Sequence, residues 1–320
     1  MVEKTTIRKI NSTLEVEYNV FICFASFENR CLVIPNKVKR KKFDKVIILV
    51  NKDGSELIND NCNQLKEMYS KKMVCLSVNL KDSFDVANQI TKEINSLKVS
   101  NINVLLDIST FTHETLMITL RILKSSKKIN SFTCVYVNAS EYCPGVPLEK
   151  KWLSKGAESV RPIMGFPGMI IPSKKTHLII IVGYEYSRAF SAISDIEPSS
   201  ISLIYGSSGS STTDKDKDAN SVFMKLVENM AFEYSNIQNY QVPCSDPEEV
   251  AGFLECIYNR NADKNIIVVP MNNKISTLGV FLSTQNNENV QVCYAPAILY
   301  NENNYSSVGN DCYIYRVDKL

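Results

Sequence analysis

The chain has few of the residues that build metal centres and catalytic triads. Its 320 residues include two histidines, His113 and His177, which lie far apart, and a single tryptophan. Ten cysteines are present, but they occur singly and no CxxC pair exists. Structural zinc sites draw on clustered cysteine and histidine. The sequence therefore predicts no metal site, and most of the cysteines are interpreted as reduced, buried thiols.

The chain also lacks a long apolar run and an excess of charge of either sign. Its apolar runs, such as Leu178 to Val182, are far shorter than the roughly 20 residues of a membrane helix. The first residues contain no apolar signal core. With 36 basic and 34 acidic residues, the formal charge is +2, so no whole-molecule field favours nucleic acid or anionic lipid. We expect a cytoplasmic globular protein with no membrane partner and no strong nucleic-acid signature.

What the sequence does contain is a regular alternation of strand and helix patterns. In the first half, β-branched and apolar runs predict five strands, at 19–25, 45–50, 73–78, 103–107 and 131–137. Helical patterns separate several of them, such as the apolar spacing that begins at Asp82 and the one that follows Thr112. Strands that alternate with helices are typical of a parallel sheet covered on both faces, so we predict a Rossmann-like α/β lobe.

The same order begins again in the second half. Predicted strands lie at 177–182, 201–205, 236–242, 265–269 and 290–294, with helices predicted at about 218–232, from 247 and at 275–282. A segment rich in proline and glycine separates the halves. We therefore predict lobe 1 at 1–142, a connector at 143–175, and lobe 2 with a C-terminal tail at 176–320. One further strand, 312–317, is possible in that tail.

The two halves share short motifs as well as element order. FASFENR in the first half corresponds to VGYEYSR in the second, so a glutamate followed by an arginine recurs after the first strand of each half. This recurrence predicts an internal duplication, with two tandem lobes related by a pseudo-two-fold axis. In that arrangement, the turns after the strands face a cleft between the lobes.

Polar turn residues after the predicted strands form the candidate ligand-binding set. Arginine suits bidentate capture of phosphate, and hydroxyl groups suit a sugar or a base. The alternative is structural, with each glutamate paired to its arginine and Thr112 acting as a helix cap. The set consists of Ser26, Glu28, Arg30, Asp107, Ser109, Thr110, Thr112, Gly183, Glu185, Arg188, Gly206, Ser207, Ser208, Asn272, Asn273 and Lys274.

Candidates for catalysis are limited to one cluster. Glu28, Asp107, His113 and Glu114 could supply acid and base groups, but one histidine beside carboxylates is weak support for an enzyme. The turn from Gly206 to Ser211 lacks the order of a P-loop and the spacing of a dinucleotide fingerprint, and is at most a phosphate cradle. We therefore predict no bound cofactor and leave catalysis open.

Together, the doubled layout and the polar turns after the first and fourth strands of each half resemble the CARF-type sensory domains of CRISPR-associated and related bacterial defence proteins. The resemblance lies in residues 26–30 with 107–112, and 183–188 with 271–274. It implies a cyclic oligonucleotide bound between the two turns. Since no nuclease or helix-turn-helix pattern is attached, it also implies a protein partner that supplies the effector output in antiviral defence.

Three hypotheses follow for the function. The leading one is a sensor that binds a nucleotide or a nucleotide-like anion, with Arg30, Arg188 and Lys274 on phosphate. The second is a nucleotide or nucleoside hydrolase that uses Glu28 or Asp107 as base, with His113 assisting. The third is a non-catalytic scaffold subunit in a multi-protein complex.

Overall fold

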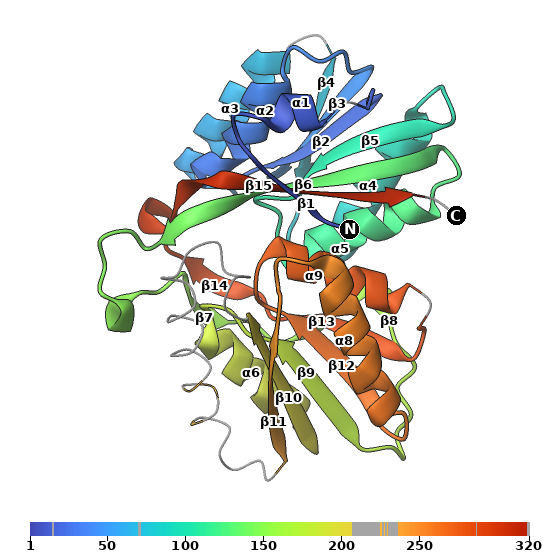
Figure 1. The fold of residues 1–320 in the computed structure, drawn as a ribbon, viewed down its shortest axis with the longest axis vertical. Helices are drawn as coiled ribbons and strands as arrows, with labels where there is room; N and C mark the ends of the chain where they lie inside the picture. Colours follow the sequence, from blue (N-terminus) through green and yellow to red (C-terminus); the bar gives the residue numbers. More distant parts are fainter. Residues whose placement is uncertain are drawn as a thin grey trace. The chain divides into compact units, whose positions relative to one another are not determined.

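A computed structural model gives the fold of the chain and describes residues 1–14, 16–69, 72–206, 225, 227, 229, 236–285 and 287–318. The chain divides into two compact units (Figure 1). Unit 1 comprises Met1–Ser140 with Ser306–Leu320, and unit 2 comprises Glu141–Tyr305. Each unit is built around its own sheet, so each is described separately.

The sheet of unit 1 has seven strands in the order β1-β15-β6-β5-β2-β3-β4. The strands from β6 to β4 in this order are parallel, whereas β15 pairs antiparallel with β1. Their bounds are β1 Glu3–Thr6, β2 Val20–Ala25, β3 Lys45–Asn51, β4 Met73–Val78, β5 Ile102–Asp107, β6 Ile129–Tyr142 and β15 Ser306–Asp318.

Helices cover both faces of this sheet, as the alternation of strand and helix requires. They are α1 Ile10–Thr13, η1 Asn29–Leu32, α2 Val33–Val38, α3 Glu56–Tyr69, α4 Ser83–Ser96 and α5 His113–Ser125. One core cluster joins apolar residues of α1, α2 and α3 to alternate residues of β2 and β3, such as Phe21 and Ile48. Because successive strand residues point to opposite faces, the alternate positions Ile22 and Ile47 face the other side, where α4 and α5 lie (Figure 1).

The main sheet of unit 2 has six strands in the order β11-β10-β9-β12-β13-β8, and a two-stranded ribbon pairs β14 with β7. All pairs in the main sheet are parallel except β13 with β8. The strands are β7 Ser154–Ala157, β8 Arg161–Pro167, β9 Thr176–Ile181, β10 Ser200–Gly206, β11 Ile237–Val242, β12 Asn265–Pro270, β13 Val290–Tyr294 and β14 Ala297–Tyr300. The helices are η2 Leu148–Lys150, α6 Tyr186–Ile196, α8 Pro247–Arg260, α9 Lys274–Thr284 and η3 Glu302–Asn304.

Both units are α/β structures with a core of five parallel strands in the same order. Taken along the chain, the third strand is followed in the sheet by the second, first, fourth and fifth: β4-β3-β2-β5-β6 in unit 1 and β11-β10-β9-β12-β13 in unit 2. An antiparallel strand, β8, follows the fifth strand in unit 2. In unit 1, Ser140 bonds Ser307 and Asn138 bonds Asp311, so β15 runs antiparallel to β6 there. The predicted parallel-sheet α/β architecture is therefore present.

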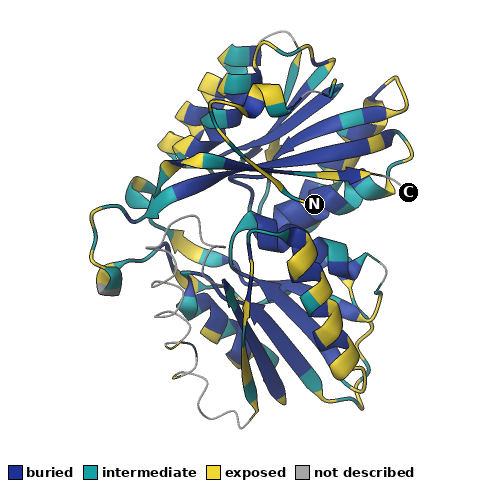
Figure 2. Ribbon diagram, in the orientation of Figure 1, coloured by how far each residue is buried: buried dark blue, intermediate teal, exposed yellow. Residues whose placement is uncertain are grey.

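Burial follows this layout. Figure 2 shows the strands of both sheets as mostly buried, while exposed residues lie on the outer faces of the helices. The parallel strands β2, β5 and β12 carry near-continuous apolar runs, as expected for strands covered on both faces. All described cysteines except Cys75 and Cys256 are buried, and none forms a disulfide, in line with their interpretation as packed thiols.

Three boundaries differ from the prediction. Residues 306–318 form a strand of the first sheet, not a tail of the second lobe. The expected connector contains β7 and β8, which pair within unit 2. Residues 29–38, for which the sequence predicted no helix, form η1 and α2. Strand pairing across a long sequence distance decides the first two, and local pattern does not reveal it. The helix predicted at 218–232 lies almost wholly outside the described residues.

Candidate functional site

Each sheet has a point where the direction of strand order reverses. In unit 1 it lies between β2 and β5, and in unit 2 between β9 and β12. Helices that follow these neighbouring strands leave toward opposite faces, so the carboxyl ends of the strands form the usual binding position of an open α/β sheet. Most of the predicted site residues follow these strands, whereas Gly206, Ser207 and Ser208 lie at and after the end of β10.

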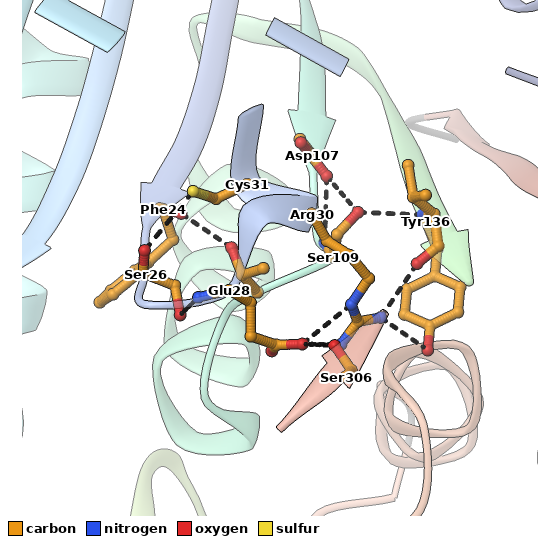
Figure 3. Close-up of polar contacts among 11 residues, drawn as sticks. Phe24, Ser26, Glu28, Arg30, Cys31, Asp107, Ser109, Tyr136 and Ser306 are labelled. Carbon is orange, nitrogen blue, oxygen red and sulfur yellow. Dashed lines mark hydrogen bonds and ion pairs between the residues drawn. The ribbon is translucent and has the colours of Figure 1, made fainter. Parts of the chain in front are cut away.

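In unit 1, Glu28 and Arg30 form a buried ion pair (Figure 3). Arg30 Nε and Nη2 donate to Glu28 Oε2 at 2.9 and 2.6 Å, and Ser306 Oγ donates to the same oxygen at 2.5 Å. The Arg30 guanidinium also donates from Nη1 to the Val137 carbonyl oxygen at 3.0 Å and to the Tyr136 hydroxyl at 3.4 Å. Arg30 is 4% exposed. Its guanidinium therefore lies away from solvent and connects the turn after β2 to β6.

Asp107 lies at the end of β5 and is 2% exposed. Its Oδ1 accepts hydrogen bonds from Ser109 N at 3.1 Å and from Ser109 Oγ at 2.5 Å, whereas its Oδ2 has no hydrogen-bond partner among the described residues (Figure 3). Burial disfavours the carboxylate and raises the pKa of Asp107 to about 7, against the opposing effect of the Ser109 hydrogen bonds. Asp107 can therefore change its protonation state near neutral pH.

The hydroxyl residues after Asp107 join strand ends. Ser109 Oγ accepts from Val137 N at 2.9 Å, which connects the turn to β6, and Thr110 Oγ1 donates to the Phe24 carbonyl at 2.8 Å, which connects it to β2. Thr112 is the N-cap of α5, because its Oγ1 accepts from Thr115 N at 3.1 Å. The structural alternative is thus correct for Thr112 as a cap.

The remaining catalytic candidates of unit 1 are buried in other contacts. His113 and Glu114 open α5 and are 5% and 4% exposed. Glu114 Oε1 accepts from Ser83 Oγ at 2.9 Å, which turns this carboxylate toward the start of α4. The other histidine, His177, bonds Ser200 Oγ and Ser202 Oγ at 2.7 and 3.0 Å inside the second sheet, where burial lowers its pKa to about 4. His177 is therefore a neutral core residue at physiological pH.

In unit 2, Glu185 and Arg188 form the corresponding buried pair. Arg188 Nη1 donates to Glu185 Oε2, and Arg188 Nε donates to the Ala295 carbonyl oxygen at 2.6 Å. The guanidinium carbon lies 5.4 Å from the centre of the Tyr294 ring, in a cation–π contact. Glu185 Oε1 is buried and has no hydrogen-bond partner among the described residues.

The two ion pairs have the same kinds of contact partners. The sequence revealed the recurring glutamate and arginine but not the tyrosine and carbonyl that contact each arginine. In unit 1, the arginine donates to the Val137 carbonyl within the fifth strand, β6, and in unit 2 to the Ala295 carbonyl directly after the fifth strand, β13. In both units, the residue before that carbonyl is a tyrosine that contacts the guanidinium. Tyr136 and Tyr294 were not among the predicted residues. The signal was present, because CVYVNA at 134–139 and VCYAPA at 292–297 occupy corresponding positions after the matched fourth-strand turns.

The fourth-strand turn of unit 2 is the more open of the two. Asn272, Asn273 and Lys274 are each half-buried. Asn272 Nδ2 donates to the Val182 carbonyl at 2.5 Å, and Asn273 caps α9 by accepting from Ser276 N at 2.8 Å. Lys274 is the first residue of α9, so its ammonium adds to the positive end of that helix.

Other predicted residues of the set have packing roles or fall outside the described part. Gly183 follows β9, and a Cβ there would collide with the Met271 carbonyl oxygen, so this glycine permits close approach of two strand ends. Ser26 is 7% exposed, and its carbonyl accepts from Asn61 Nδ2 at 2.8 Å. Gly206 ends β10 and is buried. Ser207 and Ser208 lie outside the described residues.

Neither a metal cluster nor a membrane span is found in the part of the chain that the structure describes. No group of three or more histidine, cysteine, aspartate or glutamate residues could hold an ion there. No described helix is both long enough and apolar enough to cross a membrane. A surface cavity of about 620 Å³ lies at the opposite edge of the first sheet, where Lys45, Lys72 and Lys98 line it, and it includes none of the predicted site residues.

Comparison with known proteins finds solved structures of low similarity only. No family model and no curated protein matches the chain. Among solved structures, NADPH-bound carbonyl reductase from chicken fatty liver is 7% identical over 87% of each chain, with a TM-score of 0.28. L-sorbose reductase from Gluconobacter frateurii, complexed with NADPH and L-sorbose, is 8% identical over 80% of this chain and 69% of the reductase, with a TM-score of 0.27.

A third similar structure is the methyltransferase domain of a bacterial Hen1 protein, 12% identical over 42% of this chain, with a TM-score of 0.26. The match spans 65% of that domain. At this similarity, these structures carry no argument about the fold, ligand or activity of the chain. The resemblance to CARF-type sensory domains stays a prediction. The chain is an α/β protein with two largely parallel sheets, and the order of the five parallel strands in each is that of Rossmann-like folds.

Proposed function

We propose that the protein is a sensor that binds a nucleotide-like anion at the carboxyl edge of its parallel sheets, with the primary contacts at the fourth-strand turn of unit 2. The observation that carries the proposal is the half-buried group Asn272, Asn273 and Lys274 at the start of α9, beside the point where strand order reverses. Backbone N–H groups of the first helical turn and a lysine together favour a phosphate. A sensor of this kind passes its signal to a protein partner.

Within this proposal, the arginines have a different role from the one expected. Arg30 and Arg188 are buried and paired with Glu28 and Glu185, so we assign them to positioning the turns. The unpaired Glu185 Oε1 is an acceptor suited to a ligand hydroxyl, such as that of a ribose.

The proposal extends to the origin of the two units. We infer that they are copies of one ancestral unit, related by an internal repeat. Support comes from the strand order that the two units share. It also comes from the repeated arrangement in which an arginine pairs with a glutamate and donates to a backbone carbonyl that follows a tyrosine. Sensory use in antiviral defence, as the CARF-type resemblance implies, rests on this repeat.

A thermal-shift screen with mononucleotides and cyclic oligonucleotides tests the binding proposal. A ligand at 100 times its Kd stabilises the folded state by about 2.7 kcal/mol, which gives an upward shift of several degrees in Tm. Lys274→Gln should reduce the shift. Lys175→Gln is the matched control, because Lys175 is exposed and precedes β9 at the opposite edge of the same sheet. The proposal fails if no compound shifts Tm, or if the shift in Lys274→Gln is as large as in Lys175→Gln and the unaltered protein.

The buried Asp107 carboxyl, whose Oδ2 accepts no hydrogen bond from the described residues, favours the second candidate, a nucleotide or nucleoside hydrolase. A carboxyl group with a pKa of about 7, as at Asp107, suits general acid–base catalysis at neutral pH. Glu28, by contrast, is held by Arg30 and Ser306, which leaves it poorly placed to act as base. Turnover of nucleotides that is abolished in Asp107→Asn and kept in Lys274→Gln would favour the hydrolase over the sensor.

A further inference from the structure

Two cysteines of unit 1 are in direct contact, away from the carboxyl edge of the sheet. Cys62 lies on α3 and Cys75 on β4, the edge strand of the first sheet. Their Sγ atoms are 3.6 Å apart. A disulfide has an S–S bond of about 2.05 Å, so the two sulfur atoms need to approach by only about 1.5 Å. Rotation about the Cα–Cβ bond of a cysteine can move its sulfur atom by a distance of this order.

The surroundings of the pair differ from those of the other buried thiols. A hydrogen bond from the Cys75 thiol, together with the nearby Lys66 ammonium, lowers the pKa of Cys62 to about 7. The same contact raises the pKa of Cys75, so Cys75 keeps its proton. Burial instead raises the pKa of Cys31 and of Cys244 to about 12. Cys62 is thus the thiol best able to form a thiolate, which is the nucleophilic state.

Access limits the kind of oxidant that the pair can meet. Cys62 is 2% exposed, whereas Cys75 is half-buried on the edge strand. A small, neutral oxidant such as hydrogen peroxide suits this position, because a bulky or charged reagent has little surface to approach.

We propose that Cys62 and Cys75 form a peroxide-oxidised, reversible disulfide that joins α3 to the edge strand β4. The site is independent of the proposed ligand site, since none of its residues belongs to the turns at the carboxyl edge. It makes the first unit a target of thiol oxidation in addition to any ligand that the protein binds.

The chemistry balances as a two-electron oxidation. The Cys62 thiolate attacks one oxygen of hydrogen peroxide, the O–O bond breaks, and the departing hydroxide takes up the proton that Cys62 has released, giving water and a sulfenic acid. Cys75 then attacks the Cys62 sulfur, the S–O bond breaks, and the Cys75 proton leaves with the hydroxide as a second water. The two sulfur atoms together lose two electrons, and the peroxide gains them. A dithiol reductant reverses the step by thiol–disulfide exchange.

Peptide mapping of the full chain tests the proposal. Fully reduced protein is treated with hydrogen peroxide, denatured, alkylated and digested, and the peptides are identified by mass spectrometry. We expect the peptides of Cys62 and Cys75 to be joined, with a mass lower by two hydrogen atoms, and to separate on reduction. In Cys75→Ser, the joined species should be lost and a sulfenic acid should be trapped at Cys62 by a dimedone reagent.

Two further variants separate this site from general thiol oxidation. Cys256→Ser removes an exposed thiol on α8 and should leave the joined peptides unchanged. Lys66→Gln should slow the oxidation of Cys62 severalfold and give the same product. The proposal is overturned if peroxide leaves Cys62 and Cys75 unjoined in folded protein, or joins Cys62 to another cysteine such as Cys23. The unaltered chain alone decides this, even if a variant fails to fold.

Discussion

Buried arginine is the most informative side chain in both units. A guanidinium out of water needs its charge paired and its N–H donors satisfied, and Arg188 meets this need with Glu185, the Ala295 carbonyl and the Tyr294 ring. The same solution occurs at Arg30 with Glu28. In each unit, the paired arginine fixes the turn that follows the first parallel strand by bonding a carbonyl near the fifth.

Removal of one partner should therefore be costly. Arg188→Met leaves the Glu185 carboxylate buried without its counter-charge, and we expect the free energy of unfolding of unit 2 to fall by about 3–5 kcal/mol. The double variant Glu185→Gln with Arg188→Met should recover part of this loss, because no unpaired charge remains. Urea unfolding followed by circular dichroism gives both values. Equal losses in the single and double variants would show that the ion pair is not what matters.

Asp107 gives a prediction about pH. Its pKa in the folded protein, about 7, lies above that of an unfolded aspartate, about 3.9, so folding favours the protonated carboxyl. Its stabilising effect is complete below about pH 4 and is lost as the pH rises toward and past about 7. Asp107→Asn, which stays neutral, should therefore gain stability relative to the unaltered chain as the pH rises from 5 to 8, by roughly 2–4 kcal/mol in all.

Unfolding midpoints at matched pH values check this prediction. Ser109→Ala is a useful comparison, because it removes a hydroxyl that bonds the Asp107 carboxylate and leaves the titrating group in place. A pH dependence that is the same in Asp107→Asn and in the unaltered chain would rule out Asp107 as the group responsible.

At the level of single side chains, the sequence revealed that a glutamate and an arginine recur in both halves, but not that they are structural. Glu28 with Arg30 and Glu185 with Arg188 could be found by matching motifs. Their burial could not, because it depends on the Val137 and Ala295 carbonyls, which lie about a hundred residues further along the chain. A residue whose partners are so distant looks the same in sequence whether it binds phosphate or closes a loop.

At the level of strands and helices, one glycine is required by close packing and another is not. Gly183 brings the end of β9 against the turn after β12, and an added Cβ would overlap the Met271 carbonyl oxygen. Gly183→Ala should lower the free energy of unfolding by about 1–3 kcal/mol through overpacking. Gly252 lies inside α8 with nothing within 4 Å of an added Cβ, so Gly252→Ala should raise it by about 0.5–1 kcal/mol.

The opposite signs make this pair a sensitive test, and chemical denaturation of the two variants in parallel provides it. Both exchanges add one methyl group and remove the same backbone freedom from the unfolded chain, so that contribution cancels in the comparison. If Gly183→Ala is as stable as Gly252→Ala, the strand end has room that the structure does not show.

Local pattern predicted most of the parallel strands and their helices well. The strand 73–78 and the strand 290–294 have the predicted bounds, and Asp82, Thr112 and Asp246 act as helix caps where helix starts were expected. The antiparallel strands were harder, because their pairing depends on distant partners. β1 and β8 were missed, and β15 was expected to be shorter and to belong elsewhere. Residues of these strands are partly exposed, which weakens the apolar pattern that identified the parallel strands.

Across the chain as a whole, the last described strand belongs with the first residues. β15 lies between β6 and β1 in the sheet of unit 1, and Ser306 at its start bonds Glu28. Deletion of residues 306–320 should therefore expose the edge of β6, leave β1 without its neighbour and weaken the Glu28–Arg30 pair. Backbone amides of β1 and β6 should lose protection against hydrogen exchange, whereas those of β9 and β10 should keep it, because these strands belong to the other unit. Deletion of residues 319–320 alone is the control. Equal loss of protection in both sheets would mean that the two units do not unfold separately, and no loss in β6 would mean that β15 adds nothing to the stability of the first sheet.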